Sequence, residues 1–228
     1  MPEILNRMPA VKTPLPIGTV LEILAKTYPT HPMSDVTGCD PYKVLVACLM
    51  SLRTRDDTTF PLAEKLFKVA DTPAKMVKLT VKEVEKFIYP VGFYKTKAQN
   101  IRDISQRLLD EFDGQVPDEI DMLTTFKGVG RKTANLVVGL GYNKPAVCVD
   151  VHVHRICNRL GYIQTKTPEE TEWALRKKLP KEYWSIVNKV LVRHGQDCCK
   201  PIGPLCHQCP VEQYCQKVDV KPRKVSSR

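Results

Sequence analysis

Apolar residues recur every three or four positions along most of the chain, which is the spacing of one face of an α-helix. In the stretch 17–28 this face is formed by Val20, Leu21 and Leu24, and the stretch 42–52 is apolar enough to be a buried helix. No stretch shows the strict alternation of apolar and polar residues that is typical of a half-buried strand. The pattern therefore predicts an all-α protein.

Capping and helix-breaking residues divide this pattern into separate helices. Thr80 followed by Glu83 is a capping box, Asp56 or Asp57 can cap a helix, and Gly114 ends a long one. Besides the two stretches above, we expect helices at about 56–69, 73–79, 81–88, 95–112, 119–126, 131–141, 151–160, 168–178 and 181–195. We expect a loop at 29–41 and a loose, proline-dotted segment at 1–16.

The helices expected at 119–126 and 131–141 are joined by a short turn that contains Gly128 and Gly130. Such a turn presents bare backbone N–H groups at the positive end of the second helix, where a phosphate can bind. An ordinary corner between two helices would contain the same glycines. Lys132 lies in the first turn of the second helix, where the helix dipole disfavours a cation and favours a neutral, nucleophilic amine. A lysine is more often a solvated surface charge, so its position makes Lys132 a candidate nucleophile and leaves that alternative open.

The charge balance favours a polyanionic partner. Lys and Arg number 35 and Asp and Glu number 25, which gives a formal net charge of +10. Such an excess promotes binding to phosphates through the release of counterions. The N-terminus lacks the apolar core of a signal peptide and no apolar run is long enough to span a membrane, so we expect an intracellular protein.

The nine cysteines of the chain are unevenly distributed, and five of them lie close together near the C-terminus. Cys199, Cys206, Cys209 and Cys215 have the spacing C-x6-C-x2-C-x5-C, whereas Cys198 lies outside this pattern and is expected to be a bystander. A disulfide framework is disfavoured in a protein that is not secreted. Four thiolates in one loop can hold a zinc ion or an iron–sulfur cluster, and the spacing alone does not distinguish the two.

The segment L-x-x-F-K-G-V-G-R-K-T-A-N, followed by V-D-V-H-V-x-R-x-x-N-R-L, resembles the endonuclease III family of DNA glycosylases. The resemblance extends over about 17–216 and includes the spacing of the four cysteines. It implies that Lys132 is the nucleophile, that Asp150 is the second catalytic residue, and that the cysteines hold a [4Fe-4S] cluster. Asp150 also has a purely structural interpretation, because it precedes a predicted helix and can act as its N-cap.

The resemblance also implies a division into two helical domains. A six-helix domain would cover 30–145 and carry the helix-hairpin-helix. The cluster domain would be discontinuous, made of the N-terminal segment 1–29 together with 146–216, and a basic, disordered tail would follow at 217–228. DNA would bind in the cleft between the domains, with Lys132 and Asp150 on its opposite sides.

The same resemblance implies several further contacts with DNA. Arg53 stands where bacterial relatives commonly have a glutamine that fills the gap left by a flipped base, so the preference for the opposite base stays open. Phe93 lies in a segment that resembles a wedge loop, although such an aromatic residue can equally pack in a core. The expected DNA-binding residues are Arg53, Phe93, Gly128, Gly130, Arg131, His152 and Lys200.

Together these observations predict a bifunctional DNA glycosylase and abasic-site lyase of base excision repair. We expect a monomer that binds double-stranded DNA with damaged bases or abasic sites, removes oxidised pyrimidines, and nicks the strand by β-elimination through a lysine Schiff base. Three alternatives stay open: a mismatch-specific glycosylase, a non-catalytic iron–sulfur protein that binds DNA, and a redox-sensing iron–sulfur protein.

Overall fold

The computed structural model describes residues 15–221, and every regular element in that range is a helix, which confirms the predicted all-α fold. The loose segment expected at 1–16 lies almost wholly outside the described residues. The α-helices are α1 (Ile17–Thr27), α2 (Pro32–Thr37), α3 (Pro41–Ser51), α4 (Asp56–Phe67), α5 (Pro73–Met76), α6 (Val81–Ile88), α7 (Tyr94–Phe112), α8 (Ile120–Thr124), α9 (Arg131–Leu136), α10 (Val151–Arg159), α11 (Pro168–Lys178) and α12 (Trp184–Asp197).

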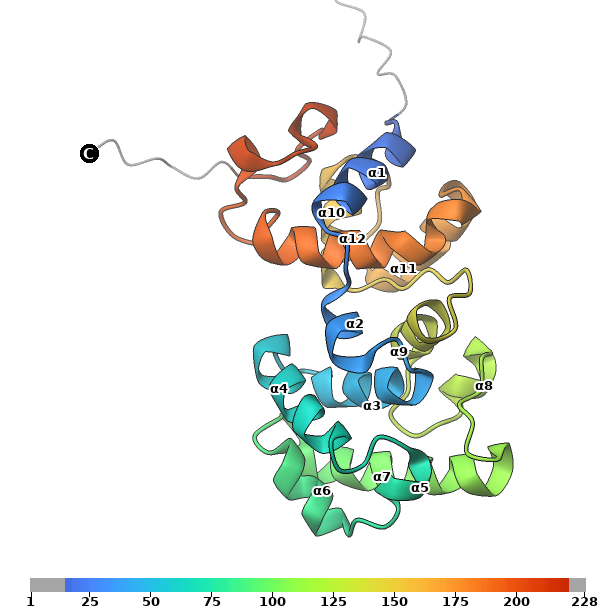
Figure 1. Ribbon diagram of the computed structural model, residues 1–228. Coiled ribbons are helices and arrows are strands. Elements are labelled where there is room, and N and C mark those ends of the chain that lie inside the picture. Colours follow the sequence, from blue (N-terminus) through green and yellow to red (C-terminus); the bar gives the residue numbers. More distant parts are fainter. Residues whose placement is uncertain (1–14, 222–228) are drawn as a thin grey trace, which may run out of the picture.

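The helices form two groups, each with its own buried cluster of apolar side chains. Helices α2 to α9 surround the first cluster, in the lower half of Figure 1. Helices α10, α11 and α12, together with the cysteine-rich loop at 198–215, surround the second cluster in the upper half of the figure. Helix α1 belongs to the second group, where it packs against α12, although it begins the described chain.

Helix α3 is the centre of the first group. Every residue from Val44 to Met50 is buried, because α3 packs against α2, α4, α7 and α9. The Asp40 carboxylate caps its N-terminus by accepting a 2.9 Å hydrogen bond from the Lys43 amide. The predicted buried helix at 42–52 is therefore confirmed, and four other helices of this group pack against it.

Two local predictions are wrong. The loop expected at 29–41 contains α2, which starts with Pro32, is capped by the His31 imidazole at 3.0 Å from the Met33 amide, and ends at Gly38 with φ of 59°. Asp56 does not cap α4, because Arg55 is the N-cap residue and makes no side-chain cap hydrogen bond. The Asp56 side chain is instead used in a contact with a distant helix.

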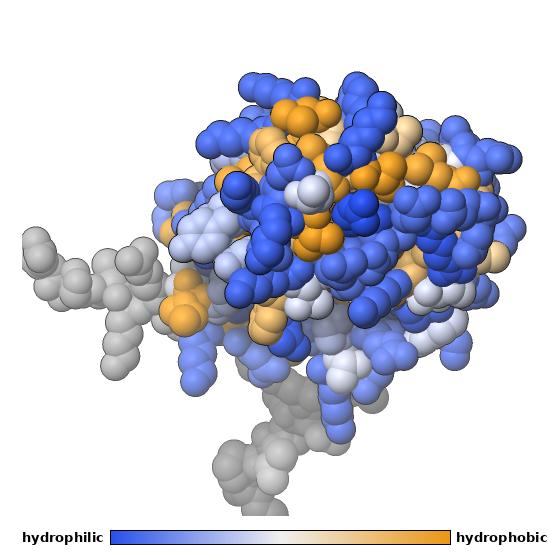
Figure 2. Space-filling model, turned by 90° about the horizontal axis from the view of Figure 1, so that it is seen from below, coloured by the Kyte–Doolittle hydropathy of each residue, from blue (hydrophilic) through white to orange (hydrophobic). Residues whose placement is uncertain are grey.

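One face of the molecule is mostly polar. Figure 2 looks onto the end of the molecule opposite α1, where hydrophilic side chains cover most of the face and apolar ones lie between them. None of the helices in residues 15–221 combines the length and the apolar character needed to cross a bilayer. The expected tail at 217–228 is described only to residue 221, and there the Val218 amide donates to the Arg159 carbonyl at 3.0 Å.

A buried carboxylate joins the two groups of helices. Glu172 of α11 is only 5% exposed, and its Oε1 accepts hydrogen bonds from Arg131 of α9 at 2.9 Å and from Arg176 at 3.0 Å. The Arg176 guanidinium also donates to the amide oxygen of Asn135, a fully buried residue of α9, at 2.9 Å. One carboxylate is thus shared by two guanidinium groups, and the network fixes α9 against α11.

We expect the Glu172→Gln substitution to lower the free energy of unfolding by about 3 kcal/mol, because it leaves two partly buried guanidinium groups without their counter-charge. The measurement is urea-induced unfolding followed by circular dichroism. Glu169→Gln on the exposed side of the same helix is the control and should change the free energy of unfolding by less than about 0.5 kcal/mol. Equal effects of the two substitutions would contradict the role given to Glu172.

Candidate active site and DNA interface

A pocket between the two groups of helices brings the two predicted catalytic residues together. Lys132 comes from α9, and Asp150 lies immediately before α10. The other lining residues come mainly from α2, α3, α4, α9 and α12. The pocket is lined by His31, Met33, Cys48, Ser51, Leu52, Asp56, Phe60, Lys132, Thr133, Leu136, Asp150, Asn188 and Val192.

The electrostatic surroundings of Lys132 differ from those expected. Burial acts to lower the pKa of this lysine, but the nearby negative charges, of which Asp150 is the strongest, outweigh burial and raise the pKa above its ordinary value. The prediction that a positive environment holds the amine neutral is therefore wrong. The helix dipole is a small effect beside a carboxylate that faces the same pocket. In the free protein the Lys132 side chain carries its proton.

Asp150 is the N-cap residue of α10. Its Oδ1 accepts hydrogen bonds from the His152 and Val153 amides, both at 2.9 Å. These bonds fix the carboxylate at the start of the helix, while the residue also lines the pocket with Lys132. The structural interpretation of Asp150 is thus confirmed, and it is compatible with a chemical role because the cap holds the negative charge in place.

Two pairs of polar side chains cross the pocket between the groups of helices, and the sequence pattern revealed neither. Asp56 of α4 accepts a 3.0 Å hydrogen bond from the Gln196 amide of α12, and burial raises the pKa of this carboxyl. The His31 Nε2 lies 3.1 Å from the Asn188 Oδ1, and burial lowers the pKa of His31 to about 4. His31 is therefore neutral near pH 7 and donates this bond.

His152 lies on the first turn of α10, and the structure gives it a packing role. Its ring lies against Gly195 of α12 so closely that a Cβ atom there would come within 2.4 Å of the ring Nδ1. The Arg155 guanidinium lies 3.1 Å from the same nitrogen. Burial lowers the pKa of His152. The ring is therefore a neutral acceptor for Arg155 and helps to join α10 to α12.

The predicted hairpin is present between α8 and α9. Gly128 has φ of 84°, a conformation that glycine adopts without strain, whereas a Cβ atom at Gly130 would meet no other atom within 4 Å. Gly130 is the N-cap residue of α9, so the first amides of this helix have no side-chain cap. Arg131, in contrast, directs its guanidinium at Glu172 and stacks it on Trp173, with the guanidinium carbon 5.2 Å from the ring centroid.

The other predicted DNA contacts in this group of helices lie side by side. Arg53 follows α3 and Phe93 precedes α7, yet the Arg53 guanidinium carbon is 5.7 Å from the centroid of the Phe93 ring. The Phe93 side chain is 64% exposed, which excludes the alternative that it packs in the core. Arg53 and Phe93 thus form one projecting feature.

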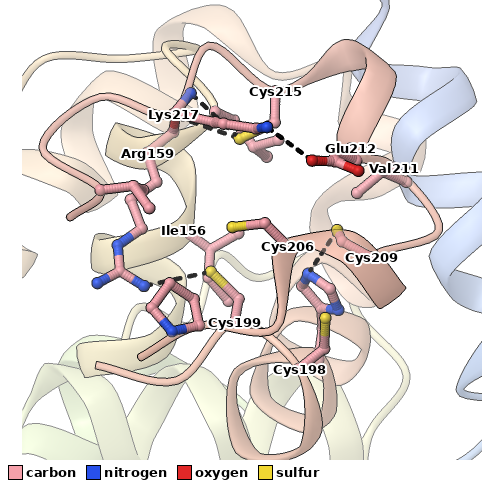
Figure 3. A pocket seen from close by; sticks show the side chains of 14 residues that line it. Ile156, Arg159, Cys198, Cys199, Cys206, Cys209, Val211, Glu212, Cys215 and Lys217 are labelled. Atoms are coloured by element: carbon pink, nitrogen blue, oxygen red, sulfur yellow. Dashed lines mark hydrogen bonds and ion pairs between the residues drawn. The ribbon is translucent and has the colours of Figure 1, made fainter. Parts of the chain in front are cut away.

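The cysteine-rich loop folds around a single cavity. Figure 3 shows the side chains of Cys199, Cys206, Cys209 and Cys215 on different sides of this cavity. Four thiols that line one cavity fit a tetrahedral metal ion or an iron–sulfur cluster. A guanidinium N–H of Arg159 lies 3.4 Å from the Cys199 sulfur, a contact suited to a thiolate.

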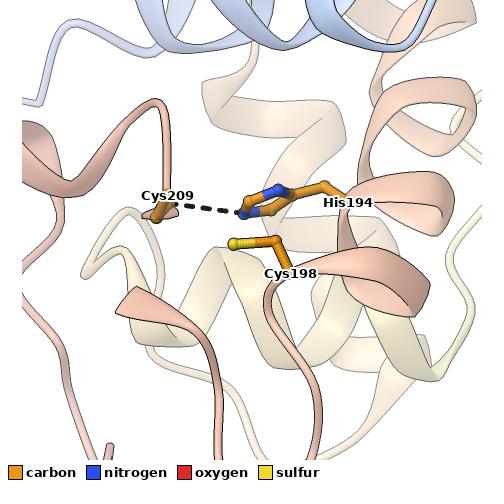
Figure 4. A group of neighbouring side chains, drawn as sticks. All are labelled: His194, Cys198 and Cys209. Atoms are coloured by element: carbon orange, nitrogen blue, oxygen red, sulfur yellow. Dashed lines mark hydrogen bonds between the residues drawn. The ribbon is translucent and has the colours of Figure 1, made fainter. Parts of the chain in front are cut away.

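The fifth clustered cysteine, Cys198, also lies at this cavity. It lines the same cavity, and its sulfur, that of Cys209 and one ring nitrogen of His194 all lie within 4.8 Å of one another (Figure 4). The His194 Nε2 lies 3.7 Å from the Cys209 sulfur, and the hydroxyl of Tyr28, the residue after α1, lies 3.4 Å from the His194 Nδ1. The expectation that Cys198 is not a ligand stays a prediction, and the structure adds that its thiol lies beside the four predicted ligands.

Two arginines of α10 hold the loop in place. Arg155 donates to the Cys199 carbonyl at 2.8 Å, and Arg159 donates to the carbonyls of Lys200 and Pro201 at 2.7 and 2.9 Å. Their guanidinium groups satisfy backbone oxygens of the loop and make no ion pair among the described residues. The Lys200 side chain is exposed beside them, where it is free to meet a phosphate.

Known proteins of one family resemble this chain over most of its length. Residues 46–181 match the family model described as HhH-GPD superfamily base excision DNA repair protein. Endonuclease III of Thermotoga maritima is 45% identical over 177 residues, which cover 78% of this chain and 83% of that protein. Endonuclease III of Escherichia coli K12 is 35% identical over 205 residues, covering 88% of this chain and 97% of that protein.

Solved structures give the same result. A trapped covalent intermediate of endonuclease III with DNA matches with a TM-score of 0.76 at 33% identity, covering 88% of this chain and 94% of that chain. A non-covalent endonuclease III–DNA complex matches with a TM-score of 0.78 at 34% identity, with the same coverage. The chain therefore belongs to the HhH-GPD superfamily of base excision DNA repair proteins and, within it, to the endonuclease III family of DNA glycosylases and abasic-site lyases.

Proposed function

We propose that this protein removes oxidised pyrimidines from double-stranded DNA and then nicks the strand at the resulting abasic site. The observation that carries this proposal is the convergence of Lys132 and Asp150 on one pocket from two groups of helices. The two buried clusters would be the cores of the predicted domains, with the DNA cleft between them. We propose further that the protein acts as a monomer inside the cell.

We propose two successive roles for Lys132, first as an ammonium group and then as a free amine. A damaged base must leave the helical stack before its bond to the sugar can be reached. The Lys132 ammonium then gives its proton to the departing base, which leaves as a neutral molecule, and the freed amine attacks the sugar C1′. Opening of the sugar ring yields a protonated Schiff base, from which loss of a proton at C2′ expels the 3′ phosphate by β-elimination.

Asp150 would act through its charge. Departure of the base leaves positive charge on the sugar, and a carboxylate held in a low-dielectric pocket stabilises that charge. The two amide hydrogen bonds to its Oδ1 keep the carboxylate from rotating away. Asp56 and the neutral His31 line the same pocket and would contact the flipped base.

The DNA contacts would surround this pocket. The free amides at Gly128 and Gly130 would bind a backbone phosphate, Phe93 would enter the base stack, and Arg53 would fill the gap left by the flipped base. Lys200 would contact a phosphate from the cysteine-rich loop. Arg131 and His152 would act indirectly, through Glu172 and Arg155, by holding α9 and α10 in place.

The four cysteines would hold a [4Fe-4S] cluster. Such a cluster supplies the bonds that fold a loop too short for an apolar core of its own. Arg155 and Arg159 orient the loop by their bonds to its carbonyls, and Arg159 also donates to the Cys199 sulfur. The exposed Lys200 would thereby be presented at a fixed position.

Replacement of Lys132 by glutamine tests the nucleophile. The Lys132→Gln protein should form no borohydride-trapped adduct with abasic DNA, because an amide cannot form a Schiff base. It should still bind abasic duplex in a fluorescence anisotropy titration, since the hairpin amides belong to the backbone. Trapped adducts formed by this variant would place the nucleophile at another residue and refute the mechanism.

Asp150→Asn separates the chemical role of Asp150 from its capping role. Asparagine retains much of the capping ability, but it lacks the charge that stabilises the sugar cation. Single-turnover base excision from an oligonucleotide with one oxidised pyrimidine should slow by about a hundredfold or more. The thermal midpoint should fall only slightly, and a variant with unchanged excision would show that Asp150 is a cap alone.

Metal analysis tests the cluster. The purified protein should be brown and contain about four iron atoms per chain. Cys206→Ser should lose iron and its visible absorption, because serine is a poor ligand for iron in such clusters. Cys198→Ser is the matched control, since it removes a neighbouring thiol that lies outside the C-x6-C-x2-C-x5-C pattern, and it should keep the iron. A colourless, active protein with bound zinc would contradict the assignment.

A further inference from the structure

Arg53 and Phe93 project from two loops that are close together. Both residues have positive φ, 54° and 58°, in the left-handed region that residues other than glycine seldom adopt. The loops touch at Gly92, where a Cβ atom would lie 3.3 Å from the Arg53 carbonyl oxygen. The Gly92 amide donates to the Thr54 hydroxyl at 3.0 Å. Two strained residues thus depend on the same contact between loops.

A buried ammonium group stands behind this contact. Lys97, the fourth residue of α7, is only 7% exposed. Its Nζ donates to the carbonyls of Met50 and Leu52 at 2.8 and 2.5 Å, and to the Thr54 hydroxyl at 3.3 Å. An ammonium group has three N–H bonds, so these acceptors use all of them. Two of the acceptors are carbonyls at the C-terminal end of α3, which carries partial negative charge.

Burying the Lys97 ammonium group costs free energy, because the charge is removed from water. Burial lowers the pKa of Lys97 to about 8, so the fold disfavours the charged form. The N-terminal end of α7 disfavours a cation as well. No carboxylate among the described residues pairs with Lys97, and its partners are the oxygens around Arg53. An apolar side chain would fill this space without the desolvation penalty of a charge. We therefore attribute the function of Lys97 to its three hydrogen bonds.

We propose that Lys97 is a positioning residue for duplex opening, which fixes the Arg53 loop against α7 so that Arg53 and Phe93 enter the DNA together. This inference rests on the proposed function of Arg53 and Phe93 at the site of the flipped base. Lys97 is buried and touches no DNA. It determines where the two projecting side chains stand, and Lys132 performs the chemistry on a nucleotide that they have already helped to extrude.

The test compares substrates that do and do not need opening. Lys97→Met keeps an unbranched side chain that is shorter by one atom, and it removes all three hydrogen bonds. Borohydride trapping should slow by about tenfold or more on an abasic site in duplex DNA. It should slow by less than about twofold on the same abasic strand without its complement, which has no duplex to open. With 2-aminopurine opposite an abasic analogue, most of the fluorescence rise on binding should be lost.

Matched variants keep the test decisive. Lys68→Met removes one charge from an exposed position directly after α4 and should trap both substrates as the unmodified protein does. If Lys97→Met does not fold, Thr54→Val replaces it, because it removes the acceptor shared by Lys97 and Gly92 with little change of volume. Equal slowing on duplex and single strands, or none on either, would overturn the proposal. A failure of the unmodified protein to trap either substrate would instead refute the proposed function.

Discussion

The site depends on an attraction between a buried ammonium and the carboxylate of Asp150. Burial acts to lower the pKa of Lys132, and the negative charges around the pocket, of which Asp150 is the strongest, raise it above its ordinary value. This attraction requires both groups of helices, because α9 supplies the lysine and the start of α10 supplies the carboxylate. The raised pKa of Lys132 therefore depends on the packing of the two groups of helices against each other. Neither group alone would contain both the lysine and the carboxylate.

The contacts that maintain this meeting are polar and mostly buried. Glu172 joins α9 to α11, Gln196 reaches Asp56 across the pocket, and the His31 ring reaches Asn188. Polar bonds have narrow geometric requirements, so they fix the spacing between the groups more strictly than an apolar contact would. The same spacing sets the distance between the hairpin and the start of α10.

The features predictable from sequence are those that depend on neighbouring residues. Rules that use only nearby residues predicted the capping box of Thr80 and Glu83 and the turn at Gly128. They also predicted the buried helix α3. Local rules missed α2, although Pro32 and Gly38 are a recognisable start and end.

The features that escaped prediction depend on residues far apart in the chain. The pKa of Lys132, the partner of Asp56 and the engagement of Arg131 by Glu172 are set by side chains that only the folded chain brings together. The positions of Lys132, Asp150 and the four cysteines in one pocket and one cavity agree with the family resemblance. Spacing along the chain pointed to the cysteine site, because the four thiols lie in one short segment, but it could not have shown that Lys132 and Asp150 meet in one pocket.

The place of α1 has a consequence for synthesis on the ribosome. Its apolar residues, such as Leu21 and Leu24, belong to the second buried cluster, and α1 packs against α12, more than 150 residues later in the chain. The helices of the first group can assemble as they emerge, because their partners are close in sequence. Helix α1 must wait with an uncovered apolar face until α12 has been made. The first helix of residues 15–221 is thus among the last of them to be buried, and at this stage the chain is open to aggregation and to chaperones.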